Sequence, residues 1–266
     1  MDPTLLFSFY IGFLGLLVGS FLNVVILRFP QALEADSLSL FPLLLPRSHC
    51  PKCLTAIAWY DNIPLLSYLN LRGKCRHCQK TISKRYPAIE ALTALLSFWI
   101  AYHFGFHLET LAALCLTWSL IALFFIDLDH MLLPDDITLP ILWLGLLFNV
   151  LNVFTSTESA ILGAVFGYGI LWSVYWVFKI ITHKEGMGYG DFKLLALFGA
   201  WLGWEALPFI ILFSSLLGSI IGILLILFRR KTKNTPIPFG PFLIIAGFTA
   251  LLWGQKINQL YLNLIF

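Results

Sequence analysis

Two aspartates stand at the edges of long apolar stretches, where an ionisable side chain is costly and therefore suggests function. Asp127 ends one apolar run, and Asp191 follows Gly188-Tyr189-Gly190 just before another. Two carboxyl groups within hydrogen-bonding distance cannot both ionise, so one keeps a proton while the other activates water against an amide carbonyl. The pair therefore predicts general acid–base hydrolysis that needs neither a metal nor a covalent nucleophile.

Other roles are open for the acidic residues around this pair. Asp191 follows glycine and could instead be the N-cap of a helix. Asp129, Asp135 and Asp136 are expected to be solvated residues at the membrane interface, with Asp135 or Asp136 capping the following helix. We therefore assign catalysis only to Asp127 and Asp191.

Two Cys-x2-Cys pairs predict a metal site. They are Cys50 with Cys53 and Cys75 with Cys78, separated by 21 residues, close to the usual zinc-ribbon spacing. Four thiolates can hold Zn²⁺ in a tetrahedron, and the metal then replaces the hydrophobic core that a small polar segment cannot build. We expect a structural zinc site, and we disfavour disulfides because the pairs are expected in the reducing cytoplasm.

Three further residues near or outside these pairs are given simpler interpretations. His49 and His77 adjoin the cysteines and could substitute as ligands, but with four thiols present we expect surface imidazoles. Cys115 lies in an apolar run without a partner in sequence and is interpreted as a small core residue.

The composition identifies the solvent of most of the chain as lipid. Of its 266 residues 59% are hydrophobic and 12% charged, against about 25% charged residues in soluble proteins, and the mean hydropathy is +0.85. Apolar runs of this length cross a bilayer as helices. The fold class is an all-α polytopic membrane protein. The net charge of +3 and the absence of a basic tract argue against a nucleic-acid partner.

About eight transmembrane helices are predicted. They cover residues 5–27, 87–103, 110–127, 137–153, 159–181, 192–204, 207–228 and 240–254. More than half of the 17 basic residues lie in 28–86, and nearly all the others lie in alternate loops, which are therefore cytoplasmic. Both termini then lie outside, and Asp127 and Asp191 both lie on the cytoplasmic side.

The chain is expected to have three parts. These are a first transmembrane helix at 1–27, a small cytoplasmic zinc-ribbon-like domain at 28–86 between helices one and two, and a transmembrane domain at 87–266. No internal repeat is evident in the sequence.

At these residues the chain closely resembles the type IV prepilin peptidases, bifunctional leader peptidases and N-methyltransferases of bacterial inner membranes. The likeness covers essentially the whole chain. The matching segments are Gly19–Val25 with Arg28 and Pro30, both cysteine pairs, Arg85–Pro87 with Glu90, Asp127–Asp135, Gly188–Asp191 and Pro238–Pro241.

The resemblance implies an aspartyl peptidase whose catalytic pair is Asp127 and Asp191. It implies cleavage of prepilins and pseudopilins of type IV pili and type II secretion after a glycine that ends a short basic leader. The new N-terminal residue is then methylated with S-adenosylmethionine. Because no strand with a Gly-rich Rossmann loop is readable, the residues that bind S-adenosylmethionine are not assigned.

The expected site suits such a substrate physically. A cationic leader stays in the cytoplasm while the apolar segment after it enters the bilayer, so the scissile bond lies at the cytoplasmic face of the inner membrane, beside the two aspartates. Asn23, near the cytoplasmic end of the first helix, could contact the site or simply a neighbouring helix. The many glycines of the helices are expected mainly to allow close helix packing.

Two other functional classes are less consistent with the sequence. A transporter or channel would also use intramembrane acids, but no acidic residue lies near the middle of a predicted span and no half of the chain is repeated. A non-catalytic assembly protein with a zinc docking domain leaves the two aspartate motifs unexplained.

Overall fold

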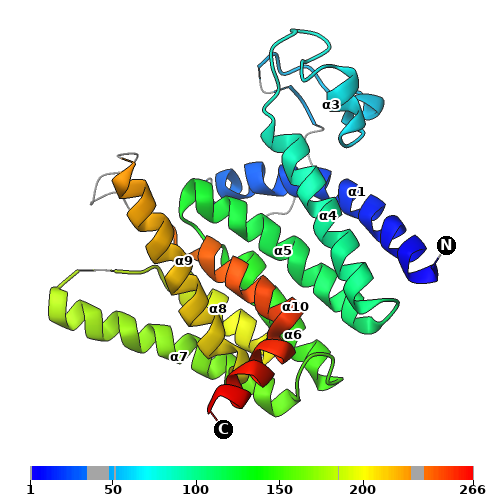
Figure 1. The fold of residues 1–266 in the computed structure, drawn as a ribbon. Helices are drawn as coiled ribbons and strands as arrows, with labels where there is room; N and C mark the ends of the chain where they lie inside the picture. Colours follow the sequence, from blue (N-terminus) through cyan, green and yellow to red (C-terminus); the bar gives the residue numbers. More distant parts are fainter. Residues whose placement is uncertain (1, 35–47, 51, 185, 229–236, 266) are drawn as a thin grey trace. The chain divides into compact units, whose positions relative to one another are not determined.

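The structure is a computed structural model that describes residues 2–34, 48–50, 52–184, 186–228 and 237–265. Within these ranges almost all regular structure is helical (Figure 1). The elements are α1 Pro3–Glu34, η1 Trp59–Asn62, α3 Leu66–Asn70, α4 Arg85–Phe104, α5 Leu108–His130, α6 Asp135–Val150, α7 Thr157–Thr182, α8 Tyr189–Leu202, η2 Trp204–Ala206, α9 Leu207–Leu227 and α10 Gly240–Ile265.

Every apolar segment expected to cross the membrane is a helix, but the number of eight spans is not confirmed. Four helices of the described chain are long and apolar enough to cross a bilayer: Pro3–Leu33, Leu108–His130, Thr157–Thr182 and Trp204–Leu227. The 14 residues of α8 extend about 21 Å, less than the roughly 30 Å of hydrocarbon. The chain is therefore a multi-pass helical membrane protein.

The first helix is longer than expected. Helical geometry continues beyond residue 27, through Arg28 and Pro30, to Glu34. Proline has no backbone N–H, so this stretch of helix lacks the hydrogen bond that residue 30 would otherwise donate to the carbonyl four residues earlier.

The chain divides into two compact units, Met1–Ala122 and Leu123–Phe266. In the first unit α1 packs closely along α4 through three glycines. A Cβ atom at Gly15 would lie 2.9 Å from the Ala94 Cα, and one at Gly19 would lie 2.8 Å from the Glu90 Cα. Small residues at helical spacing let two backbones approach in lipid, where no hydrophobic force draws the helices together.

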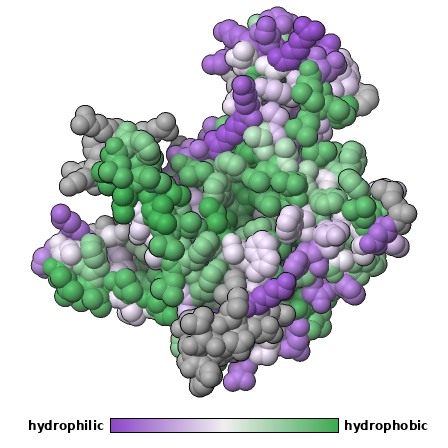
Figure 2. Space-filling model, in the orientation of Figure 1, coloured by the Kyte–Doolittle hydropathy of each residue, from purple (hydrophilic) through white to green (hydrophobic). Residues whose placement is uncertain are grey.

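The same unit contains the four-cysteine domain, residues 48–84 of the described chain, with η1 and α3. Isolated β-bridges join His49 to Ala56 and Lys74 to Thr81. Figure 2 shows this domain as mostly hydrophilic, in contrast to the apolar surface of the helices, as expected for a part that lies in water.

The second unit is built around α8, whose side chains from Phe192 to Trp201 are almost all buried. On one side α7 packs against it through Gly163 and Gly199, where each glycine lies against the backbone of the other. On the other side the Asn149 amide of α6 donates to the carbonyls of Ala200 and Trp201, 2.9 Å away in each case. This short helix is therefore enclosed by its neighbours.

The outer faces of α7 and α9 are apolar and exposed in the isolated chain. In the most apolar 18-residue stretch of each helix, only 11% is buried for Trp204–Leu227, which contains α9, and 22% for α7. Figure 2 shows apolar side chains over this part of the surface. Exposed apolar faces of this extent are those that contact lipid.

Replacing Gly163 with Val should destabilise the second unit, because the new Cβ would collide with the backbone of Gly199. We expect the midpoint of thermal unfolding in detergent to fall by roughly 3–10 °C. The control is Gly169→Val in the same helix, where nothing lies within 4 Å of the added Cβ. Equal midpoints for the two variants would contradict this packing.

Candidate functional site

Asp127 lies in the last turn of α5 and is buried, with 5% of its surface exposed. Its carboxyl group contacts the backbone N–H of Gly240, at the start of α10. The Oδ2 atom is the one buried side-chain oxygen or nitrogen of the described residues that has no hydrogen-bond partner. A buried oxygen without a partner is costly, so its presence indicates a site at which another group binds.

Asp191 is the third residue of α8, and 7% of its surface is exposed. The N-cap of this helix is Gly188, so the alternative role of Asp191 as the N-cap is wrong. Instead its carboxyl group accepts a hydrogen bond from the Gly188 backbone, as the third helical residue does in a capping box. The glycine-rich approach therefore fixes the direction of this carboxyl group.

The structure brings the two carboxyl groups together. Asp127 and Asp191 are close enough for an electrostatic interaction between their side chains. Leu133 lies against both Gly240 and Gly190, the glycines next to the two carboxyl groups. A Cβ atom at Gly240 would lie 3.2 Å from the Leu133 Cδ1, and one at Gly190 would lie 2.8 Å from the Leu133 Cβ. Two buried carboxyl groups that interact electrostatically disfavour each other's ionised form.

Three other acidic residues of this region are outside the buried pair, as expected. Asp129, Asp135 and Asp136 are all exposed. The expected capping role is wrong, because the N-cap of α6 is Pro134 and Asp135 and Asp136 lie in the first helical turn. The Asp135 carboxylate instead accepts from the Lys193 ammonium at 2.7 Å, which joins the starts of α6 and α8.

Gly240 also belongs to the site around Asp127, although no role was predicted for it from the sequence. A Cβ atom there would lie 2.5 Å from the Asp127 Oδ2, so glycine is the residue that fits against this carboxyl group. The signal was the Pro238–Pro241 segment, in which a glycine between prolines indicates a constrained backbone. Asn23 belongs to the first unit, where its amide donates to the Tyr86 carbonyl at 3.1 Å, so it contacts a neighbouring helix.

The four cysteines converge in the first unit. The sulfur atoms of Cys50, Cys53, Cys75 and Cys78 all lie within 4.8 Å of one another. The Sγ–Sγ distances are 3.9 Å for Cys50 with Cys78 and 4.0 Å for Cys53 with Cys75. Zinc–sulfur bonds of about 2.3 Å in a tetrahedron place sulfurs about 3.8 Å apart, so the cluster fits a zinc ion.

The two cysteine pairs have the same local backbone. Cys50 N donates to Thr55 O and Leu54 N to Cys50 O, and the equivalent bonds in the second pair run from Cys75 N to Lys80 O and from Gln79 N to Cys75 O. Leu54 and Gln79 both have positive φ, 57° and 56°. A short structural repeat therefore exists that the sequence did not reveal, because it consists of turns and the two segments share only the cysteines and one isoleucine, Ile57 in the first and Ile82 in the second.

The electrostatics of the cluster favour a cation. Hydrogen bonds from Thr55 lower the pKa of the Cys53 thiol to about 6. Although the Lys80 backbone favours the Cys78 thiolate, burial and the neighbouring cysteines raise the pKa of Cys78 to about 11. Four thiolates at this separation repel one another, and a divalent cation removes that cost.

The other candidate ligands are not part of the cluster. The metal-binding group found among the described residues consists of the four cysteines without His49 or His77. His77 is exposed, and the backbone of His49 pairs with Ala56. Cys115 is half-buried in α5.

Comparison with known proteins gives separate family matches for the region that contains the four cysteines and the region that contains the two aspartates. Residues 13–104, which include all four cysteines, match the bacterial peptidase A24 N-terminal domain. Residues 114–223, which include both aspartates, match the type IV leader peptidase family. A prepilin leader peptidase/N-methyltransferase of Aeromonas hydrophila is 56% identical over 98% of this chain and 95% of the relative.

The chain belongs to the type IV leader peptidase family. Other relatives of similar length carry the same name. The one from Pseudomonas aeruginosa is 54% identical over 94% of this chain and 91% of its own, and the one from Legionella pneumophila is 46% identical over 95% and 93%. No solved structure matches the chain.

Purified protein should contain about one zinc ion per chain, and Cys53→Ser combined with Cys75→Ser should remove it, because two of four thiolate ligands are lost. Inductively coupled plasma mass spectrometry measures the metal directly. Cys115→Ser, outside the cluster, is the control and should keep the metal. Wild-type protein without zinc, or full zinc content in the double variant, would show that the cluster is not the metal site.

Proposed function

We propose that this protein cleaves the short basic leader of type IV prepilins and pseudopilins after glycine, and then methylates the new N-terminal amine with S-adenosylmethionine. The relatives' names support both activities. The observation that supports the assignment of the peptidase residues is the buried pair Asp127 and Asp191, with an unpartnered oxygen on Asp127.

The pair can act as an acid–base couple on one bound water molecule. The ionised carboxyl group takes a proton from the water molecule while the water oxygen attacks the scissile carbonyl carbon. The protonated carboxyl group gives its proton to that carbonyl oxygen. When the tetrahedral intermediate collapses, one carboxyl group gives a proton to the leaving amine and the other takes one back from the hydroxyl group, so the pair ends with one shared proton again. The Gly240 and Gly188 backbones hold the two groups in place for this exchange.

The active site is proposed at the cytoplasmic face of the bacterial inner membrane, with both termini on the periplasmic side. The concentration of basic residues in 28–86 and in alternate loops supports this orientation. An apolar segment after the scissile bond can then stay in the bilayer during cleavage. The pilin partner is recognised by this basic-then-apolar pattern.

The zinc ion is proposed to be structural, and the peptidase domain to be 87–266. All four cluster sulfurs are protein ligands, so no open position is left for a water molecule or substrate. When bound, zinc would hold together a domain whose described residues contain only short helices and isolated bridges.

Asp127→Asn and Asp191→Asn should each lower prepilin cleavage by about 10²–10⁴-fold, because an amide cannot take or share the proton. Product mass after incubation with a purified prepilin measures the activity. Asp129→Asn and Asp136→Asn are matched controls on exposed carboxylates and should stay near wild type. Full activity in either variant of the pair would refute the assignment of that aspartate.

Gly240→Ala should lower cleavage by about 10²-fold, because the new Cβ would displace the Asp127 carboxyl group. The same change at Gly222, where the nearest atom is a side-chain carbon at 3.8 Å, is the control. Thermal unfolding of both variants checks that the fold is kept. Unchanged cleavage by the Gly240 variant would mean that this contact does not position the aspartate.

A further inference from the structure

The first unit contains a cavity of about 280 Å³ that the peptidase chemistry does not use. Its walls come from α1, from the start of α4 and from the four-cysteine domain. The volume is near the lower end of the roughly 300–1,000 Å³ that small-molecule sites occupy. Both proposed peptidase aspartates belong to the other unit. The cavity is therefore a second candidate site.

A buried carboxyl group lies at the helix end of this cavity. Glu90 of α4 is 9% exposed, and its Oε2 accepts from the Leu65 backbone N–H at 2.9 Å. The Ser20 side chain of α1 also interacts with it. Leu65 has a φ of 58° and a ψ of −48°, a conformation that costs free energy in a residue other than glycine. The chain keeps this strain where it directs a donor at Glu90, which is typical of functional sites.

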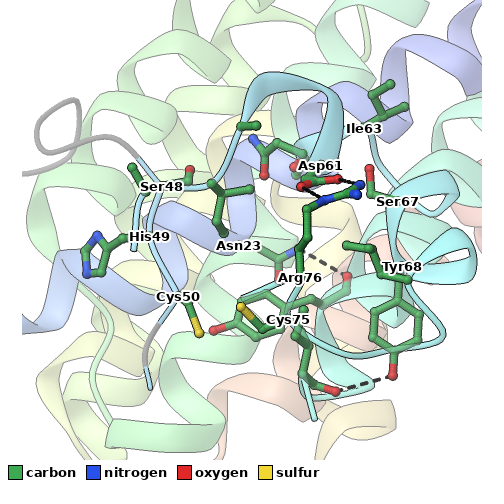
Figure 3. A pocket seen from close by; sticks show the side chains of 18 of the residues that line it. Asn23, Ser48, His49, Cys50, Asp61, Ile63, Ser67, Tyr68, Cys75 and Arg76 are labelled. Atoms are coloured by element: carbon green, nitrogen blue, oxygen red, sulfur yellow. Dashed lines mark hydrogen bonds and ion pairs between the residues drawn. The ribbon is translucent and has the colours of Figure 1, made fainter. Parts of the chain in front are cut away.

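The domain end of the cavity combines aromatic rings with a fixed ion pair. The Arg76 guanidinium contacts Asp61 through two hydrogen bonds, of 2.7 and 2.6 Å, and it lies over the Tyr60 ring at 5.6 Å (Figure 3). This pair lowers the pKa of Asp61. Figure 3 also shows Tyr68 of α3 at this end. Arg76 stands between Cys75 and Cys78, so the metal cluster fixes this wall.

This combination suits a ligand that carries a positive charge and an aromatic base. S-adenosylmethionine has a sulfonium centre, an adenine ring and an amino-acid group. A buried carboxylate stabilises the sulfonium, and tyrosine rings offer faces for stacking. Resting on the proposed N-methyltransferase activity, we propose that this cavity is the methyl-transfer site and that Glu90 faces the sulfonium and the attacking amine.

The proposed reaction transfers one proton and one methyl group. The Glu90 carboxylate takes a proton from the new N-terminal ammonium group of the substrate. The amine lone pair then forms a bond to the methyl carbon while the carbon–sulfur bond breaks, and its electron pair stays on sulfur as a neutral thioether. Glu90 returns its proton to water, so the products are the N-methylated ammonium and S-adenosylhomocysteine.

Calorimetric binding of two analogues tests the position of Glu90. Sinefungin carries an amine near the place of the sulfonium, whereas S-adenosylhomocysteine has a neutral sulfur. Glu90→Gln should lower the affinity for sinefungin by about tenfold or more and the affinity for S-adenosylhomocysteine by less than about threefold. Only sinefungin loses a charge-assisted contact in this variant. Glu109→Gln, outside the cavity in α5, is the matched control and should bind both as wild type does.

A bulky residue in the wall tests the cavity itself. Ala58→Phe places a ring in the space and should reduce binding of both analogues and methylation by at least about tenfold, while prepilin cleavage stays within about twofold of wild type. Ala91→Phe, exposed in α4 and outside the cavity, is the control. Zinc content and cleavage together show that the Ala58 variant is folded.

The outcomes separate this proposal from the activity on which it rests. If wild-type protein binds and methylates but both cavity variants bind the analogues unchanged, the cavity is not the site, although the enzyme is a methyltransferase. If wild-type protein cleaves a prepilin but neither binds S-adenosylhomocysteine nor methylates, the proposed second activity fails and this inference fails with it. Selective loss of sinefungin affinity in Glu90→Gln supports the proposal.

Discussion

The second unit depends on holding two carboxyl groups together inside a bundle of apolar helices. Both groups are largely shielded from bulk water there, so the surrounding backbone must fix them. The chain does this at two helix ends. Asp127 is in the last turn of α5 and Asp191 in the first turn of α8, where unpaired backbone groups are available. A glycine backbone supports each group, and at Gly240 only a residue without Cβ fits, because a Cβ atom there would lie 2.5 Å from the Asp127 Oδ2.

Close approach is also what shapes the helices around the pair. The α8 helix is too short to cross a bilayer alone, and it is enclosed because Gly163 and Gly199 bring α7 against it and because Asn149 binds its last carbonyls. In lipid such contacts replace the hydrophobic force that packs soluble helices. The helix that carries the proposed catalytic Asp191 in its first turn is thus fixed along both sides, while α7 and α9 keep apolar faces for the membrane.

Much of this could be predicted from sequence because membrane helices have strong local signals. Apolar runs predicted the long helices of the two units but not the short η1 and α3, and the glycine-rich approach and the cysteine spacing predicted where chemistry would occur. The number of spans was not confirmed, since 14 or 16 apolar residues form a helix without reaching across a bilayer. The Gly240 contact, the Lys193 pairing of Asp135 and the Leu65 donor to Glu90 join residues far apart in sequence. A single sequence carries no signal that shows which residues pair over such separations.

The two proposed reactions make opposite demands on water, and this gives a physical reason for two separate polar sites. Peptide hydrolysis needs a water molecule that two carboxyl groups can activate, so a site for it must admit water to an unpartnered oxygen such as the Asp127 Oδ2. Methyl transfer to an amine needs an unprotonated nitrogen and a stabilised cation, which a partly dry pocket with one buried carboxylate provides. If Glu90 were close to a second acid, as Asp191 is to Asp127, it would share a proton and stabilise a cation less well. Its donors, the Leu65 backbone and the Ser20 side chain, are neutral groups whose hydrogen bonds favour the ionised carboxylate.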